Sequence, residues 1–380
     1  MIKALINCRV FDGQKLHTDK AVLLDGDRVS ALLPEENIPA SVSDRCDLEG
    51  HILAPGLIDI QVNGGGGVMF NDAPTVDTIR RIGMAHRRFG TTGFLPTLIS
   101  SDFDTMKRAV DAVEQAIAAG VPGILGVHLE GPFLNAEKCG IHHADRFCQP
   151  GDREFELLTS VREGRTLVTL APELVSADSI AMLTEQGVLV FGGHSAATFE
   201  QVQVALRAGL RGFTHLFNAM SSFESRSPGM VGAALHDGNS WCGIIADGQH
   251  VHPATFAVAV AAKPKGRSLL VTDAMASVGS DMKAFDFDGN RIIIKDGSCR
   301  TVSGQLAGSD LDMITAVRNA SSFAGLSPYE ALRMASSYPA QALGLGEELG
   351  RIQPGFRASF IEIDEDLNLY RTWIDGEVGA

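Results

Sequence analysis

Short apolar runs alternate with longer amphipathic or alanine-rich stretches from about Leu57 to Met275. Runs rich in β-branched residues, separated by helical patterns, are typical of βα units and a parallel sheet. The predicted strands are LIDIQV (57–62), TGFLPTLI (92–99), GILGVHLE (123–130), TLVTLAPE (166–173), VLVFGGHS (188–195), GFTHLFNA (212–219), CGIIADG (242–248) and SLLVTDA (268–274). Eight strands are the number that closes a (β/α)8 barrel, so we predict an α/β protein with this TIM-like architecture.

The stretches between the predicted strands carry signals for helix ends. Thr75–Phe89 is followed by Gly90, and Phe103–Ala119 is followed by Gly120. Glycine adopts the left-handed conformation that often closes a helix. We therefore predict helices over both stretches.

Both ends of the chain have a different pattern of hydrophobic and polar residues from the central region. They alternate apolar and polar positions with Asp-Gly turn signals, as in AVLLDGDRVSALLP and WIDGEV. Neither end holds enough strands for a stable sheet of its own. We therefore predict a small β-sandwich domain from residues 1–54 together with 346–380, and a barrel domain from residues 55–345.

Composition and charge narrow the classes of function. The 380 residues are 45% hydrophobic and 21% charged, as in ordinary globular proteins, and no stretch reaches the ~18 apolar residues of a membrane span. The first residues lack the pattern of a secretory signal, so a cytoplasmic protein is expected. Six cysteines without C-x-x-C spacing indicate reduced thiols. A net charge of -14 disfavours nucleic acid or an anionic membrane as partner.

Polar residues at the ends of predicted strands indicate where chemistry could occur. In such barrels the active site lies at the carboxyl ends of the strands. Glu130, His194 and His215 end three strands, and together they form a ligand set suited to a catalytic divalent metal. Asp273 ends a further strand and could face a water molecule at the metal. Asp247 and His250 follow the strand before it.

The remaining histidines of interest are interpreted differently. His128 precedes Glu130 by two residues, so it lies on the same strand face but deeper, and a structural role is expected. His86 precedes two arginines, which predicts a solvated helix face without function. His142 and His143 lie in a loop that overhangs the predicted metal. From the residues alone, it stays open whether they have a function or are ordinary exposed loop histidines.

Several motifs together carry a family resemblance along nearly the whole chain. They are APGLIDIQVNGGGG, GVHLEGPFLN, CGIHH, GGHSAAT, THLFNAM, GIIADGQHVHP, LVTDAMA and GRIQPGFRA. In this order they resemble the N-acetylglucosamine-6-phosphate deacetylase family of the amidohydrolase superfamily. The resemblance implies metal-dependent hydrolysis of the acetamido group of N-acetylglucosamine 6-phosphate, in amino-sugar catabolism or cell-wall sugar recycling.

The first strand departs from the two-metal members of this superfamily. Those enzymes commonly carry a His-x-His pair where this chain has Gln61 and Asn63. Neither amide replaces imidazole as a strong ligand, so we expect one divalent ion per subunit. Zinc is the first expectation, with iron or another divalent ion as alternatives. The glycines that follow, Gly64 to Gly67, predict a backbone turn too close to the site for Cβ atoms.

The resemblance also implies roles for individual residues. Glu130, His194 and His215 would hold the metal, Asp273 would be the catalytic acid and base, and His142 would polarise the substrate carbonyl. A homodimer is implied, with Arg226 and His250 reaching the phosphate in the neighbouring site. The residues expected to bind the sugar phosphate are Ile141, His142, Asn218, Ala219, Arg226, Asp247, Gly248, Gln249, His250, Leu306, Ala307 and Gly308.

Three other functions compete with this one. A cyclic-imide hydrolase would need a strand lysine that bridges two metals, and TLVTLAPE contains none. A non-catalytic relative would be expected to have lost the metal ligands or Asp273, and all four residues are present. A deacetylase for the galactosamine epimer stays open, because the sequence does not reveal the configuration of one hydroxyl group.

Overall fold

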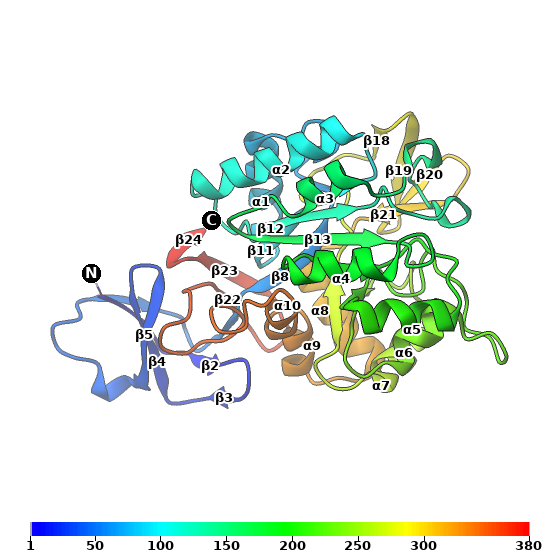
Figure 1. Ribbon diagram of the computed structural model, residues 1–380. Helices are drawn as coiled ribbons and strands as arrows, with labels where there is room; N and C mark the ends of the chain where they lie inside the picture. Colours follow the sequence, from blue (N-terminus) through cyan, green and yellow to red (C-terminus); the bar gives the residue numbers. More distant parts are fainter. Residues whose placement is uncertain (1, 380) are drawn as a thin grey trace.

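The computed structural model describes residues 2–379, and its centre is a nearly closed barrel of parallel strands (Figure 1). The strands pair in chain order, and the last returns to the first where the Asp273 backbone N–H donates to Gln61 O at 3.0 Å. This confirms the predicted barrel. Its strands are β8 (Leu57–Val62), β11 (Thr91–Ile99), β12 (Gly126–Glu130), β13 (Arg165–Leu170), β14 (Leu189–Gly192), β15 (Gly212–Phe213), β16 (Trp241–Ile245) and β17 (Ser268–Val271).

Helices surround the barrel, and their starts and ends follow local chemistry. The Thr75 hydroxyl accepts the Thr78 N–H at the start of the first helix, and Gly90 has a φ of +86° just beyond its end. The helices are α1 (Val76–Arg87), α2 (Phe103–Ala118), α3 (Asp152–Leu158), α4 (Ala177–Glu185), α5 (Phe199–Ala208), α6 (Gly229–His236), α7 (Pro253–Ala262), α8 (Met313–Ala324), α9 (Pro328–Met334) and α10 (Ser337–Ala342). Short 3-10 turns are η1 (Glu35–Asn37), η2 (Ala136–Lys138) and η3 (Ala144–Arg146).

Two sheets lie beside the barrel (Figure 1). One holds only strands from the amino-terminal end of the chain, and the other joins strands from both ends. In spatial order, one holds β5 (Arg28–Pro34), β4 (Lys20–Asp25), β1 (Ile2–Ile6) and β6 (Asp44–Asp47), and the other holds β24 (Glu377–Gly379), β23 (Leu369–Ile374), β22 (Phe360–Ile363), β7 (Ile52–Pro55), β2 (Arg9–Phe11) and β3 (Leu16–His17). Leu5, Val22, Phe360 and Trp373 share one core between them. The terminal β-sheet domain was predicted; its boundaries near residues 54 and 345 stay a prediction.

A third sheet, which the sequence analysis did not predict, follows the last barrel strand. Its antiparallel strands are β18 (Ala284–Phe287), β19 (Asn290–Lys295), β20 (Ser298–Thr301) and β21 (Leu306–Ser309). Phe285 and Ile292 from this sheet share a buried cluster with Met275, and Ile141 packs against it. The sheet therefore carries residues 306–308 to the carboxyl end of the barrel.

The glycine run forms a tight hairpin against the first helix, with strands β9 (Gly64–Gly65) and β10 (Val68–Met69). A Cβ on Gly65 would lie 2.8 Å from His86 Nε2, so glycine is needed there for the close approach to α1, while the expected approach of this turn to the site stays a prediction. His86 itself was predicted wrongly: it is fully buried and its Nε2–H donates to Gly64 O at 2.9 Å. Burial lowers the pKa of His86 to about 4, so the ring is neutral.

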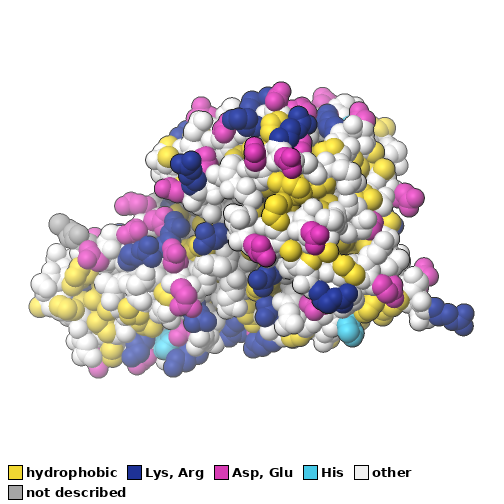
Figure 2. Space-filling model, viewed as in Figure 1, with side chains coloured by type: hydrophobic (Ala, Val, Ile, Leu, Met, Phe, Trp, Pro, Cys, Tyr) yellow, Lys and Arg dark blue, Asp and Glu magenta, His cyan; other side chains and the backbone are white. Residues whose placement is uncertain are grey.

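One face of the surface is seen in Figure 2. Figure 2 shows acidic and basic side chains interspersed over this face, with apolar atoms scattered between them. Among residues 2–379, no helix is long and apolar enough to cross a membrane.

Candidate active site

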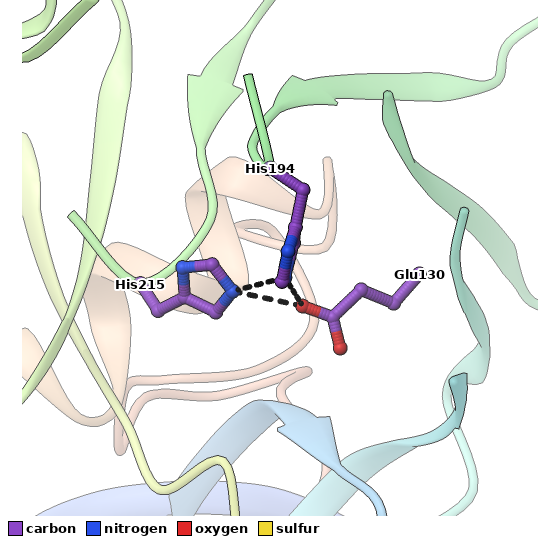
Figure 3. A group of neighbouring side chains, drawn as sticks. All are labelled: Glu130, His194 and His215. Atoms are coloured by element: carbon purple, nitrogen blue, oxygen red, sulfur yellow. Dashed lines mark hydrogen bonds and ion pairs between the residues drawn. The ribbon is translucent and has the colours of Figure 1, made fainter. Parts of the chain in front are cut away.

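Three side chains converge at the carboxyl end of the barrel. Glu130 ends β12, while His194 and His215 follow β14 and β15 (Figure 3). The His215 Nε2 lies 2.9 Å from Glu130 Oε1 and 2.9 Å from His194 Nε2, and His194 Nε2 lies 3.3 Å from Glu130 Oε1. All three side chains are buried. The structure thus brings together the ligand set that the strand ends predicted.

The donor atoms of this cluster fit a divalent cation. The second ring nitrogen of His194, Nδ1, donates to Lys138 O at 2.7 Å, which leaves Nε2 with its lone pair toward Glu130. Ligand atoms that lie ~2.0–2.2 Å from a tetrahedral zinc ion are about 3.3–3.6 Å apart, and these donor atoms, 2.9 to 3.3 Å apart, are close to that spacing. His194 and His215 have positive φ angles of 47° and 33°, a costly conformation that the fold maintains where both rings must meet.

The electrostatics of the cluster favour a charged carboxylate. Burial alone would raise the pKa of Glu130, but the adjacent ring nitrogens of His194 and His215 outweigh it and lower that pKa well below its usual value. Burial likewise opposes protonation of His215, yet the hydrogen bond and charge of Glu130 raise the pKa of that ring. A negative oxygen therefore sits among neutral or positive nitrogens, as a cation site requires.

Asp273 adjoins this cluster through two amides. Gln61 Nε2 donates to Asp273 Oδ1 at 3.1 Å and to Glu130 Oε1 at 3.2 Å, and Asn63 Nδ2 donates to Asp273 Oδ1 at 2.7 Å. Their expected significance, that they replace the imidazoles of a second metal site, stays a prediction. The two amides fix one carboxylate oxygen of Asp273, while Oδ2 has no hydrogen bond to residues 2–379. Burial and the charge of Glu130 raise the pKa of Asp273 to about 6, which suits a proton carrier.

His142 reaches the same pocket from the loop after β12. The Ser100 backbone N–H donates to His142 Nδ1 at 3.3 Å, and the Ser100 hydroxyl lies 2.8 Å from the same atom. Nδ1 is therefore an acceptor, and the ring proton is assigned to Nε2. Burial lowers the pKa of His142 well below its usual value, so the ring is neutral. A neutral imidazole with a free Nε2–H can donate to a carbonyl oxygen.

One pocket of about 150 Å³ joins these groups. Of the predicted site residues, it is lined by Glu130, Ile141, His142, His194, His215, Asn218, Ala219, His250, Asp273, Leu306 and Gly308. Sequence reasoning did not assign four further lining residues to the site, namely Asn63, Ile99, Gly140 and Met275. A larger cavity lies elsewhere, but among residues 2–379 the one candidate metal cluster of histidine and carboxylate side chains lies in this pocket, together with Asp273.

Five predicted substrate residues do not line this pocket: Arg226, Asp247, Gly248, Gln249 and Ala307. Asp247 instead builds the loop after β16, where its carboxylate accepts the backbone N–H groups of Gln249 and His250. It also lies 2.6 Å from His250 Nδ1, which holds that ring.

His250 and Arg226, the two residues expected to reach a neighbouring site, lie in different settings. His250 borders the pocket of its own chain, where the Asp247 turn holds its ring, and its reach into a neighbouring site stays a prediction. Arg226 lies in a fully exposed segment, residues 222–227, between β15 and α6. Its place in a neighbouring site stays a prediction.

Comparison with known proteins places this arrangement in a family. The model of the amidohydrolase family matches residues 52–379, and that of the NagA composite domain matches residues 3–53. The chain belongs to the amidohydrolase family. Members of this family typically depend on divalent metals, and the Glu130, His194 and His215 cluster is a site that could hold one.

Relatives within the amidohydrolase family match almost the whole chain. N-acetylgalactosamine-6-phosphate deacetylase of Shewanella sp. (strain ANA-3) is 45% identical over 86% of this chain and 82% of its own. N-acetylglucosamine-6-phosphate deacetylase of Haemophilus influenzae is 33% identical over 98% of both chains. The crystal structure of N-acetylglucosamine-6-phosphate deacetylase from Pasteurella multocida superposes with a TM-score of 0.96, 36% identity and complete coverage of both chains.

Proposed function

We propose that this protein hydrolyses the acetamido group of N-acetylglucosamine 6-phosphate, releasing glucosamine 6-phosphate and acetate. The observation that carries the proposal is the convergence of Glu130, His194 and His215 with Asp273 in one buried pocket. The names of the amidohydrolase relatives supply the substrate class. The reaction would serve amino-sugar catabolism or cell-wall sugar recycling in the cytoplasm.

The roles of the side chains follow from their hydrogen bonds. Glu130, His194 and His215 hold one divalent ion, zinc in the first instance and iron as the alternative. The chemistry that such an ion supplies is Lewis acidity toward a water molecule and toward the amide carbonyl. Asp273 takes the proton of the attacking water on its unbonded Oδ2 and returns it to the departing nitrogen. His142 donates its Nε2–H to the oxygen on which negative charge develops.

The phosphate requires cations that outweigh a net charge of -14. His250, on the rim of the pocket, provides one donor. Arg226 provides a permanent charge from a partner subunit, since its exposed loop is outside the pocket of its own chain. The protein would thus act as a homodimer. Asn218, Ala219 and residues 306–308 orient the sugar.

Acetate release from matched substrates tests this function. The panel is N-acetylglucosamine 6-phosphate, N-acetylgalactosamine 6-phosphate and N-acetylglucosamine, each with the wild-type protein and Asp273→Asn as the blank. We expect rapid acetate release from N-acetylglucosamine 6-phosphate, and much slower release from N-acetylglucosamine, which lacks the phosphate. Absence of acetate from both 6-phosphates, with protein that holds its metal, would refute the proposal.

A second candidate function has one specific observation in its favour. The relative from Shewanella, at 45% identity, is named for the galactosamine epimer. The same panel distinguishes the two functions, because the epimers differ only at one hydroxyl group. A kcat/KM at least about tenfold higher for N-acetylgalactosamine 6-phosphate, or about 1.4 kcal/mol in transition-state stabilisation, would replace the first function with the second.

A further inference from the structure

A second cavity, of about 550 Å³, lies at the amino-terminal ends of the barrel strands. Its walls are the starts of β13, β14 and β16 and the carboxyl ends of α3, α4 and α10. Figure 1 shows the start of β13 near α10, at the end of the barrel remote from the β18–β21 sheet. No lining residue is shared with the active-site pocket, and the length of β13 alone separates the two ends by about 20 Å. We call it the N-terminal cavity.

The N-terminal cavity is lined by cations. Arg162, Arg165 and Arg211 border it, and its lining within the described chain includes no carboxylate. This is unusual for a protein with 46 acidic and 32 basic residues. Arginine is the side chain best suited to phosphate and carboxylate groups, because its planar fork donates two parallel hydrogen bonds.

Part of this positive charge has a structural use. Helix carboxyl ends carry partial negative charge, and Arg165 Nε donates to Leu343 O at the end of α10, at 2.9 Å. The guanidinium groups of Arg162 and Arg211 have no such partner: neither forms a hydrogen bond or ion pair with residues 2–379. Only the backbone N–H of Arg162 is bound, to Glu114 Oε1. Two cations therefore remain available to a ligand.

The rest of the lining of the N-terminal cavity is mixed, with apolar side chains beside the polar Thr159, Thr166, Thr184, Gln186 and Gln341. Side chains that line it include Leu158, Val161, Val188, Leu189, Trp241 and Leu343. The Trp241 ring packs beneath Arg267, whose guanidinium carbon lies 4.5 Å from the ring centroid, so a further cation stands behind this wall. The indole Nε1 of Trp241 is buried without an acceptor among the described residues. An apolar wall beside unpaired guanidinium groups is complementary to a ligand with an apolar body and an anionic head.

We propose that the N-terminal cavity binds a small organic anion, in which a phosphate or carboxylate group contacts Arg162 and Arg211 and an apolar ring or chain packs against Trp241. The site is separate from the chemistry at the other end of the barrel. It does not depend on which N-acetylhexosamine 6-phosphate the enzyme hydrolyses.

Calorimetric titration with phenyl phosphate tests this proposal. The wild type should bind the probe in an event that weakens roughly ten- to hundredfold in Arg162→Ala/Arg211→Ala, since two charge-assisted contacts are lost. A matched control, Arg80→Ala/Arg291→Ala, removes the same charge from two exposed arginines elsewhere, and its affinity should stay within about threefold of the wild type. Inorganic phosphate should bind several-fold more weakly than phenyl phosphate, because it lacks the apolar body.

Three results would overturn the proposal. They are an absence of binding up to millimolar probe, equal affinities in the wild type and the Arg162/Arg211 variant, and an equal loss in the control variant. Equal affinity for inorganic phosphate and phenyl phosphate would contradict the proposal that the apolar part of the ligand packs against Trp241. If the double alanine variant fails to fold, the single variants Arg162→Gln and Arg211→Gln apply the same test with smaller changes.

Discussion

Buried histidines occur at the rim of the barrel and also at two packing positions, His86 in the helix layer and His128 inside the barrel below the rim, which together we call the packing layer. At the rim, His194 and His215 share one carboxylate oxygen of Glu130. In the packing layer, His86 bonds a backbone carbonyl and His128 lies between the hydroxyls of Thr97 and Thr169. Burial lowers the pKa of both packing-layer rings to about 4, whereas Glu130 raises the pKa of His215. The partner, rather than burial, separates a histidine of the candidate metal site from a structural one.

The backbone shows the same division. His194, His215 and Asp273 have positive φ angles of 47°, 33° and 54°, whereas His86 lies within a regular helix and His128 within a regular strand. Positive φ at a residue other than glycine costs free energy, so these positions persist only because surrounding structure imposes them. The rim therefore gives up stability for convergence of its side chains, while the packing layer contributes stability. Substitutions at the rim should therefore change activity, and substitutions in the packing layer should change stability.

The largest effect is expected from removing a rim ligand. His215→Ala should lose the metal and, with it, activity to below detection, because a carboxylate and one imidazole do not retain a catalytic ion. Wild-type protein should hold about one ion per chain by elemental analysis, since Gln61 and Asn63 replace the ligands of a second. His128→Gln is the matched variant from the packing layer, and it should keep its metal. Two equally tight ions per wild-type chain would contradict the single-metal site.

The second-largest effect is expected at Asp273, where a substitution should remove proton transfer without removing the metal. Asp273→Asn should keep the metal but lose about 10² to 10⁴ in kcat, the typical contribution of a positioned acid and base. KM should change little, because Oδ1 of Asp273 is already engaged by Gln61 and Asn63. Metal content and steady-state kinetics on the same preparation check both statements. A variant with near-normal kcat would remove Asp273 from the mechanism.

The fold was largely predictable because its signals are local. Apolar runs located all eight barrel strands, and Gly90 marked a helix end. His86 was predicted wrongly because its neighbours in sequence are arginines; its spacing from Ile79 and Ile82 instead places it on the buried face of α1. The β18–β21 sheet was missed, although FDFDGNRIIIKDGS contains two turn signals between alternating residues.

The candidate site was predictable only where it lies at strand ends. Glu130, His194 and His215 each end or follow a barrel strand, so the architecture alone brings them together. Ser100, which fixes the ring proton of His142, lies 42 residues away in sequence. No local pattern encodes that contact, because it depends on how a loop folds back over the rim.

A pH experiment isolates the packing layer. The folded pKa of His86, about 4, lies below the unfolded value of ~6.5, so its contribution to stability is complete above pH 6.5 and is lost as the pH falls toward 4. The difference corresponds to about 3 kcal/mol. Between pH 7.5 and 4, the wild type should therefore lose about 3 kcal/mol more unfolding free energy than His86→Gln, measured by denaturant titration. The control His236→Gln changes an exposed ring and should follow the wild type.

Arg226 extends the comparison to a side chain that has no hydrogen-bond or ion-pair partner among residues 2–379. It lies in an exposed loop, outside the pocket whose substrate needs a cation. Under the proposed function, we expect the partner of Arg226 to be the substrate phosphate bound in the neighbouring subunit. Arg226→Ala should lower kcat/KM for the 6-phosphate about ten- to hundredfold, or roughly 1.5 to 3 kcal/mol, and hardly affect N-acetylglucosamine.

Subunit mixing distinguishes a shared site from a structural arginine. In a dimer of one Arg226→Ala chain and one Asp273→Asn chain, one of the two sites combines an intact Asp273 with an intact Arg226 from across the interface. Mixed dimers should therefore recover kcat/KM toward half the wild-type value, whereas each parent stays impaired. The metal ligands cannot account for such recovery, because they are intact in both parents. Verified exchange without recovery would mean that Arg226 acts within its own chain. Equal losses of activity with and without the 6-phosphate would mean that Arg226 is merely structural.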